Sequence, residues 1–87
     1  MWRVEFDRDA ARDLKRLDSA AQRAVLRFLR ERVATTEDPR HFGKPLVGDM
    51  KGLWRYRVGD YRIVARIEDD RLIVLVVTVG HRREVYR

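Results

Sequence analysis

The hydrophobic pattern of the chain changes period along its first half. Residues 2–6 alternate between apolar and charged side chains, and this period of two predicts a half-buried strand. From about Asp9 the apolar residues recur at helical spacing, which predicts a short helix with Asp7 or Asp9 as its N-cap. A second amphipathic helix is expected over residues 20–34. Ser19, with a glutamine three residues later, has the spacing of a capping box for that helix.

The last third of the chain returns to strand-like patterns. We expect three strands there, at residues 53–58, 61–68 and 72–79. Gly59-Asp60 and Asp69-Asp70 are turn-forming pairs between these strands, so an antiparallel meander is predicted. The last strand is apolar on both faces, which is typical of a strand inside a sheet. Residues 35–52, with both prolines and three glycines, are expected to form a loop in which His41, Lys44 and Lys51 are the residues with chemical potential.

The order β-α-α-β-β-β predicts an α+β fold, with a helical hairpin packed on one face of a small, mostly antiparallel, twisted sheet. With 87 residues, the chain is expected to form a single domain over residues 1–87. It contains no cysteine, which excludes disulfides and thiolate chemistry. The charged N-terminus lacks a signal-peptide core, and the longest apolar run is far short of a membrane span. We therefore expect a cytoplasmic protein without a membrane partner.

The formal net charge of +6 predicts a polyanionic partner, either a nucleic acid or an acidic protein. Arginine strongly outnumbers lysine in the chain. This preference matters because a guanidinium binds phosphate through a planar fork, whereas an ammonium acts as a point charge.

The arginines of the meander are spaced so that they gather on strand faces. Arg55 and Arg57 lie two residues apart and share one face of their strand. Arg62 and Arg66, four residues apart, share one face of the next strand. If both pairs point to the side without helices, four guanidinium groups converge there. Trp54 and Tyr56 alternate with these arginines, so core packing is expected for both aromatic residues.

Common catalytic constellations are missing from the sequence. It has no glycine-rich phosphate loop, no cluster at metal-ligand spacing and one serine, so we expect neither a cofactor nor a metal. Metal-free RNA cleavage remains open, because the 2′-hydroxyl of the substrate is its own nucleophile. That reaction needs positive charge on the phosphate, a proton acceptor and a proton donor. Candidates for proton transfer are His81, Glu84 and Tyr86.

Three motifs together resemble the RelE/ParE superfamily of bacterial and archaeal toxins, and specifically its RelE branch. They are KPL-x-G-x-x-x-G-x-W-R-Y-R, G-D-Y-R-I and V-G-H-R-x-x-V-Y, and the resemblance extends over essentially the whole chain. It implies a toxin of a type II toxin–antitoxin system. The implied activity is that of a ribosome-dependent, metal-independent endoribonuclease, which cuts messenger RNA in the A site and thereby inhibits translation.

The resemblance also implies roles for individual residues. Arg62 and Arg82 would neutralise the phosphate and stabilise the transition state, while Arg55 and Arg57 would bind RNA and assist proton transfer. Tyr86 would stack on a base or act as the general base. His81 is a second acid–base candidate, because some relatives use a C-terminal histidine. Further RNA contacts are expected from Lys51, Arg66 and Arg83.

Several alternatives remain at this point. A ParE-like toxin of the same fold would inhibit DNA gyrase and cleave nothing. Two residues also have structural alternatives that do not depend on this choice: an ion pair with an acidic residue of 68–70 for Arg62, and core packing for Tyr86. In either case the resemblance implies a RelB-like antitoxin in a hetero-oligomeric complex, which binds operator DNA through the antitoxin. The ribosome and messenger RNA are the further expected partners.

Overall fold

The computed structural model describes residues 1–83. Five strands form one sheet: β1 (Arg3–Phe6), β2 (Gly43–Pro45), β3 (Trp54–Val58), β4 (Tyr61–Glu68) and β5 (Ile73–His81). Two helices, α1 (Arg8–Arg16) and α2 (Ser19–Phe28), follow β1, and a π-helical turn (Leu29–Val33) extends the second. Short 3-10 turns lie at Pro39–Phe42, Gly48–Met50 and Asp69–Arg71. None of the helices within residues 1–83 has the length and apolar character needed to cross a membrane.

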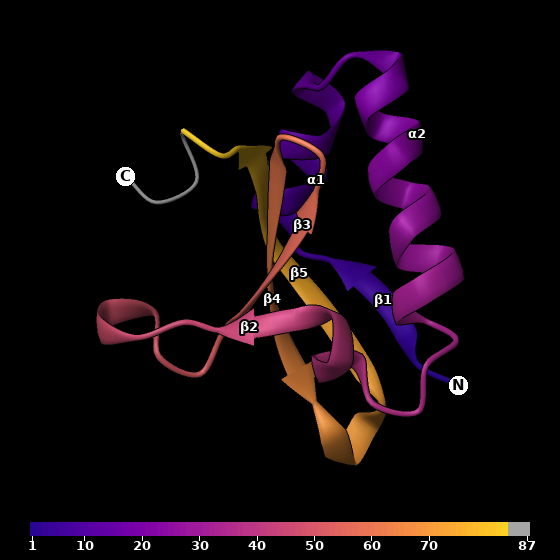
Figure 1. The fold of residues 1–87 in the computed structure, drawn as a ribbon, viewed down its shortest axis with the longest axis vertical. Coiled ribbons are helices and arrows are strands. Elements are labelled where there is room, and N and C mark those ends of the chain that lie inside the picture. The colour runs from indigo at the N-terminus through magenta and orange to yellow at the C-terminus, as the bar shows by residue number, and fades with distance from the viewer. Residues whose placement is uncertain (84–87) are drawn as a thin grey trace.

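The sheet has the strand order β1-β5-β4-β3-β2. Only the β1–β5 pair is parallel, and the other pairs are antiparallel. Figure 1 shows α1 and α2 on one side of the sheet, while the segment between β2 and β3 projects away from the body. The expected α+β architecture is confirmed. The apolar β5 has a neighbour on each side, as its pattern predicted.

The hydrophobic core fills the space between the helices and the sheet. Its buried members include Ala10, Val25, Leu29, Val33, Tyr56, Ile63, Ala65, Val74, Val76 and Val79. Full burial of each larger side chain contributes about 1.5–3 kcal/mol. This burial holds the hairpin on one face and leaves the other face of the sheet open.

Aspartates cap both helices. Asp7 accepts a hydrogen bond from Ala10 N at 2.8 Å, which confirms one of the two expected caps of α1. The predicted Ser19 cap of α2 is wrong. Asp18 has the extended backbone of an N-cap and accepts from Ala21 N at 2.8 Å. The capping box does not form because the Gln22 amide donates back to Leu17 O at 2.9 Å.

The prediction of a loop over residues 35–52 is partly wrong, because β2 lies within it. Residues 43–45 pair with β3 at the edge of the sheet, and Gly43 lies opposite Tyr56. A Cβ on Gly43 would lie 3.0 Å from the Tyr56 ring and 3.1 Å from Arg55 O, so a larger residue here would require its neighbours to shift. Three residues are too few for a periodic signal, and tertiary pairing therefore decides the strand.

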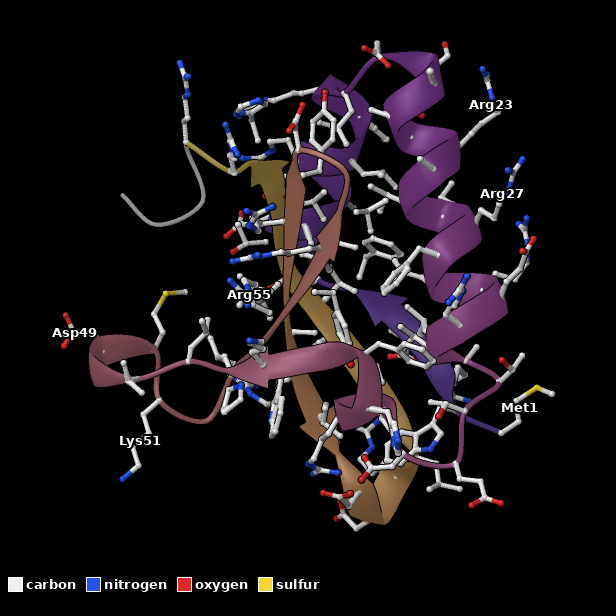
Figure 2. All side chains as sticks on the ribbon, viewed as in Figure 1. Met1, Arg23, Arg27, Asp49, Lys51 and Arg55 are labelled. Carbon is white, nitrogen blue, oxygen red and sulfur yellow. The ribbon has the colours of Figure 1, made fainter. Side chains whose placement is uncertain are left out.

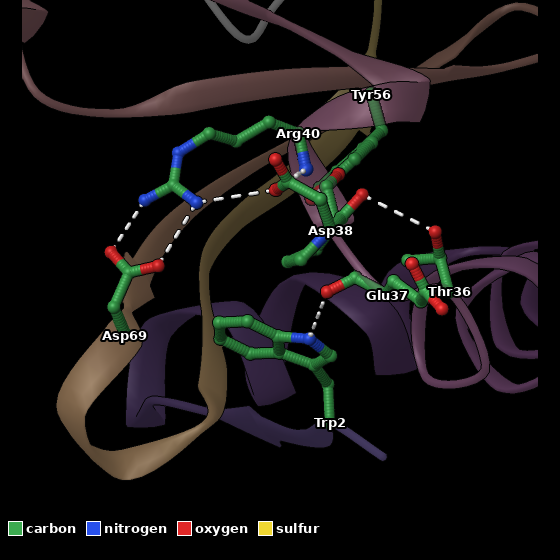
Figure 3. Close-up of polar contacts among 8 residues, drawn as sticks. Trp2, Thr36, Glu37, Asp38, Arg40, Tyr56 and Asp69 are labelled. Atoms are coloured by element: carbon green, nitrogen blue, oxygen red, sulfur yellow. Dashed lines mark hydrogen bonds and ion pairs between the residues drawn. The ribbon is translucent and has the colours of Figure 1, made fainter.

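Side-chain contacts hold the segment that leads to β2 (Figure 3). The Tyr56 hydroxyl donates to Pro39 O at 2.7 Å, and the indole of Trp2 donates to Glu37 O at 3.1 Å. Arg40 bridges Asp38 and Asp69 and lies 5.7 Å from the centre of the Trp54 ring. Hydrogen bonds from Arg40 hold the pKa of the Asp69 carboxyl below its usual value. The segment is thus tied to the turn before β5.

Asp18→Ala should destabilise the protein by about 1 kcal/mol, because one N-terminal N–H of α2 loses its acceptor. Ser19→Ala is the matched control and should cost less, because the Ser19 side chain makes no capping bond. Urea denaturation measures both. A larger loss for Ser19→Ala than for Asp18→Ala would contradict the assignment of the cap.

Candidate nucleic-acid interface

The register between β3 and β4 determines where the arginines point. Arg57 lies directly opposite Arg62, and Arg55 lies directly opposite Val64. Residues directly opposite in an antiparallel pair share a face of the sheet. Tyr56 pairs with the buried Ile63 on the helix side, so the three arginines lie on the open side. Whether the arginines of β3 and β4 share a side depends on the register, which the sequence did not give. The structure confirms that they do.

Two further cations share this open side. Arg66, two pleats along β4 from Arg62, is exposed there, and Lys44 of β2 lies directly opposite Arg55. We call this surface the basic face, and define it by Lys44, Arg55, Arg57, Arg62 and Arg66. Figure 2 shows Arg55 on the side of the sheet away from α2, whereas Arg23 and Arg27 point outward from that helix.

The basic face contains two like-charged cross-strand pairs next to each other, Lys44 with Arg55 and Arg57 with Arg62. Like charges directly opposite on a sheet are destabilising. The ion pairs among residues 1–83 join Arg3 to Glu5, Arg71 to Glu68, and Arg40 to two aspartates, and none includes Lys44, Arg55 or Arg57. The arrangement therefore favours an external anion.

Two arginines of the basic face have side chains that are partly or largely buried. Arg62 is only 9% exposed, and its Nη1 donates to Tyr61 O at 3.4 Å. Arg55 Nε is buried and has no hydrogen-bond partner within residues 1–83. A buried donor without a partner costs about 1–3 kcal/mol. Such a donor is ready to bind an acceptor brought by a ligand.

The aromatic residues of β3 lie on the helix side. Tyr56 is completely buried, which confirms the expectation of core packing, and burial raises the pKa of its hydroxyl above the usual value. Trp54, half-buried, also faces this side, opposite the buried Ala65. Neither residue can stack on a base that lies over the basic face.

His81 lies on the opposite side of the sheet from the basic face. It pairs in register with Tyr61, and their ring centroids are 5.8 Å apart in an edge-to-face arrangement. Its Nδ1 accepts from Arg83 N at 3.3 Å, so the neutral ring carries its proton on Nε2. His81 thus lies on the side of the sheet opposite Arg57 and Arg62, although Arg82 follows it directly in the chain.

The remaining predicted residues lie around the end of β5 or away from it. Arg82 and Arg83 are exposed and follow β5, and Arg82 N donates to Asp60 O at 2.8 Å in the turn between β3 and β4. Lys51 lies on the projecting segment and points into solvent (Figure 2). Tyr86 lies outside the described residues. The structure therefore does not bring Lys51 to the basic face.

Lys44 was missed as a site residue because its strand was not recognised. The sequence does contain a signal for this strand, because Pro45 follows Lys44 and a proline within a strand is typical of a sheet edge. Chemically, the basic face can bind an extended polyanion along β3 and β4. Residues 1–83 contain no group of three His, Cys, Asp or Glu placed to hold a metal ion.

Comparisons with known proteins agree over nearly the whole chain. A family model described as the ParE toxin of a type II toxin–antitoxin system matches residues 4–86. Toxin RelG of Mycobacterium tuberculosis is 34% identical over 86 residues, which cover 99% of this chain and 97% of that protein. Toxin RelE of the same organism is 35% identical, over 99% of this chain and 87% of its own length.

Solved structures of similar fold also come from toxins or toxin–antitoxin complexes. The toxin–antitoxin complex RelBE2 from Mycobacterium tuberculosis contains a chain with a TM-score of 0.85 and 32% identity, covering 95% of this chain and 93% of that one. The isolated RelE toxin of E. coli has the same fold, with a TM-score of 0.73 and 22% identity, over 93% and 84% of the two chains. These similarities define a toxin of a type II toxin–antitoxin system. The chain belongs to the RelE/ParE superfamily and is a RelE-family toxin.

Lys44→Gln should raise the free energy of unfolding by about 0.2–1 kcal/mol at low ionic strength, because it removes the charge opposite Arg55. The gain should fade in high salt, where the screening length falls to about 3 Å at 1 M. Denaturant titrations at two salt concentrations measure it. Lys51→Gln removes the same charge from the projecting segment and should change stability little. Equal effects of both variants would show that the pairing has no energetic role.

Tyr56 should ionise only above the ordinary pH range of a tyrosine, because burial raises the pKa of its hydroxyl. Because its pKa is raised in the folded state, its contribution to stability is complete below the ordinary pKa of about 10 and is lost above it. Ultraviolet absorbance of phenolate during an alkaline titration measures this step. Tyr56→Phe should remove this late step. If Tyr56→Phe instead removes an absorbance step in the ordinary pH range of tyrosine, the pKa of Tyr56 is not raised.

Proposed function

We propose that this toxin is an endoribonuclease that cleaves messenger RNA in the ribosomal A site without a metal ion. The observation that carries the proposal is on the basic face, where Lys44 lies opposite Arg55 and the buried Nε of Arg55 has no hydrogen-bond partner within residues 1–83. A phosphodiester backbone would offset the repulsion between Lys44 and Arg55 and bring an acceptor to that nitrogen. The similarity to toxins named RelE and RelG supports the same function.

The proposed reaction uses the RNA as its own nucleophile. The 2′-oxygen attacks the adjacent phosphorus, the bond to the 5′-oxygen breaks, and a cyclic phosphate and a 5′-hydroxyl result. One proton leaves the 2′-hydroxyl and another reaches the departing 5′-oxygen. The protein must accept the first proton, donate the second and stabilise the extra negative charge on the phosphorane.

The charge stabilisation would come from arginines. Arg62 is held rigidly because it is nearly buried, so its guanidinium costs little reorganisation when the charge develops. Arg82, fixed by its backbone bond to the turn after β3, would contribute from the end of β5. Arg55 and Arg57 would bind the backbone of the RNA, with Arg66 and Lys44 extending the contact.

Proton transfer is assigned to Tyr86 rather than His81. The His81 ring faces the helices, on the other side of the sheet from Arg57 and Arg62. Tyr86 follows the exposed Arg82 and Arg83 along the chain, and a tyrosine that lies among arginines has its phenolate form favoured.

We further propose that an antitoxin binds this toxin in a hetero-oligomeric complex that acts in the cytoplasm. Solved structures of similar chains are toxin–antitoxin complexes, among them RelBE2 of Mycobacterium tuberculosis. A RelB-like partner with acidic residues would complement the charge of +6. The complex would bind operator DNA through the antitoxin, because the toxin uses its basic face for RNA.

Primer extension on a defined messenger RNA in a reconstituted translation system tests the proposal. The wild type should cut within A-site codons only when ribosomes are present. Arg82→Ala should lower the rate about 10²–10³-fold, the usual effect of removing one donor to a developing charge. Arg57→Ala and Tyr86→Phe should also reduce cutting. Arg23→Ala removes the same charge from the outer side of α2 and serves as the control (Figure 2).

Inhibition of DNA gyrase is the second candidate function. It is favoured by the matching family model, which is described as the ParE toxin. Intact RNA with an antitoxin-free preparation that still arrests growth would overturn the endoribonuclease proposal. A supercoiling assay with the same protein would then show whether gyrase is the target.

A further inference from the structure

Two rings are exposed at the β2 edge of the sheet, in the 3-10 turn Pro39–Phe42 that leads into this strand. Phe42 is 39% exposed, and no other phenylalanine, tyrosine or tryptophan of residues 1–83 is exposed to this degree. The imidazole of His41, also exposed, has its centroid 6.4 Å from that of Phe42. We call these two residues the ring patch.

The ring patch rests on the hydrophobic core. The ring centroids of Phe42 and Phe28 are 6.3 Å apart in an edge-to-face arrangement. Phe28, in turn, lies 5.8 Å from the completely buried Tyr56. A continuous row of rings therefore leads from the core to the surface, and Phe42 is the member that meets solvent.

The backbone of the turn is held before and after the two rings. Pro39 O accepts from the Tyr56 hydroxyl at 2.7 Å, and His41 N donates to Asp38 O at 3.1 Å. Gly43, directly after Phe42, pairs with Tyr56 in the sheet. Because the turn is already ordered, a ligand can bind the rings with little loss of conformational entropy.

Cationic side chains surround the ring patch. A hollow of about 270 Å³ adjoins it on α2, with Phe28, Arg27, Glu31 and Arg32 among its walls. Both arginines are exposed, and neither forms an ion pair within residues 1–83. Rings beside cations are the combination that binds single-stranded nucleic acid, since bases stack on the rings and phosphates contact the cations.

The basic face leads directly to this patch. Its cations form a row from Arg62 on β4 through Arg57 and Arg55 on β3 to Lys44 on β2. β2 is an edge strand, so within residues 1–83 no further strand lies beyond Lys44. Phe42 precedes Lys44 by two residues, a separation of at most about 7 Å along the chain.

The basic face itself offers no aromatic ring for a base. Trp54 and Tyr56 alternate with its arginines and face the helices. An RNA strand held by its phosphates on the basic face therefore finds its stacking partner beyond the β2 edge, where Phe42 and His41 are exposed.

From these observations we infer that the ring patch is a base-stacking site for the RNA strand that lies on the basic face. A phosphate at Lys44 and Arg55 would position the strand, and the base of the next nucleotide would turn around the β2 edge onto Phe42 and His41. Every base has a π-face, so the site would add affinity without sequence preference. The inference rests on the proposed function for RNA as the ligand, but stacking does not depend on cleavage.

Fluorescence anisotropy with 2′-O-methyl oligonucleotides of increasing length tests the site, because these strands lack the 2′-hydroxyl that cleavage needs. The affinity should rise in a step once the strand reaches the ring patch. A single abasic nucleotide, moved along the strand, should remove this step at one position. With the long strand alone, the ring proton resonances of Phe42 should shift. A wild type that shows neither the abasic-sensitive step nor this shift would overturn the inference.

Phe42→Leu removes the ring but keeps an apolar side chain against Phe28. It should weaken binding of the long strand about 5–150-fold, the value of one stacked base, and leave the short strand unaffected. It should cause no further loss when the abasic nucleotide occupies the critical position. Phe42→Tyr keeps the ring and should bind like the wild type. Val47→Ala, which shortens an exposed apolar residue of the projecting segment, is the control.

The outcomes distinguish this inference from the proposed function. A step in affinity that depends on Phe42, without RNA cleavage in the translation system, would refute the endoribonuclease and leave the stacking site intact. Cleavage without such a step would refute the stacking site and leave the endoribonuclease intact. If Phe42→Leu binds RNA normally but weakens the complex with the antitoxin, the ring patch is a protein contact and the inference is wrong.

Discussion

The pairing of β3 with β4 organises both sides of this molecule. Tyr56 and Ile63 lie opposite each other and are completely buried beneath the helices, so their burial fixes the register of the two strands. The same register places Arg57 opposite Arg62 on the open side. A slip of one residue would exchange the two faces, exposing the core residues and burying the arginines. The hydrophobic core therefore maintains the geometry of the basic face.

The basic face is kept at a cost in stability. Like charges face each other across two strand pairs, and the buried Nε of Arg55 has no partner in the described part of the chain. The core and the bonds around Arg40 and Tyr56 offset this cost. A protein selected for stability alone would replace such pairs with neutral or opposite charges. Their presence is best understood as preparation for an anionic ligand.

The end of β5 presents different residues on the two sides of the sheet. Alternation along the strand places Gly80 in the row of Arg62 and turns His81 toward the helices, where Asp13 and Arg16 approach it. The cleft beside His81 and the basic face therefore lie on opposite sides of the same strand.

The sequence by itself determined the features that depend on local periodicity. From periodicity we predicted the bounds of β4, the Asp7 cap and the alternation of arginines with aromatic residues along β3. The sequence motifs were specific enough to indicate the family. Tertiary structure decided the rest, because it depends on contacts between distant residues. The pairing of β2 brought Lys44 to the basic face, strand register placed four arginines together, and the same register turned His81 away. The cleft beside His81 likewise exists only because α1 and β5, 66 residues apart at Asp13 and Val79, meet in the fold.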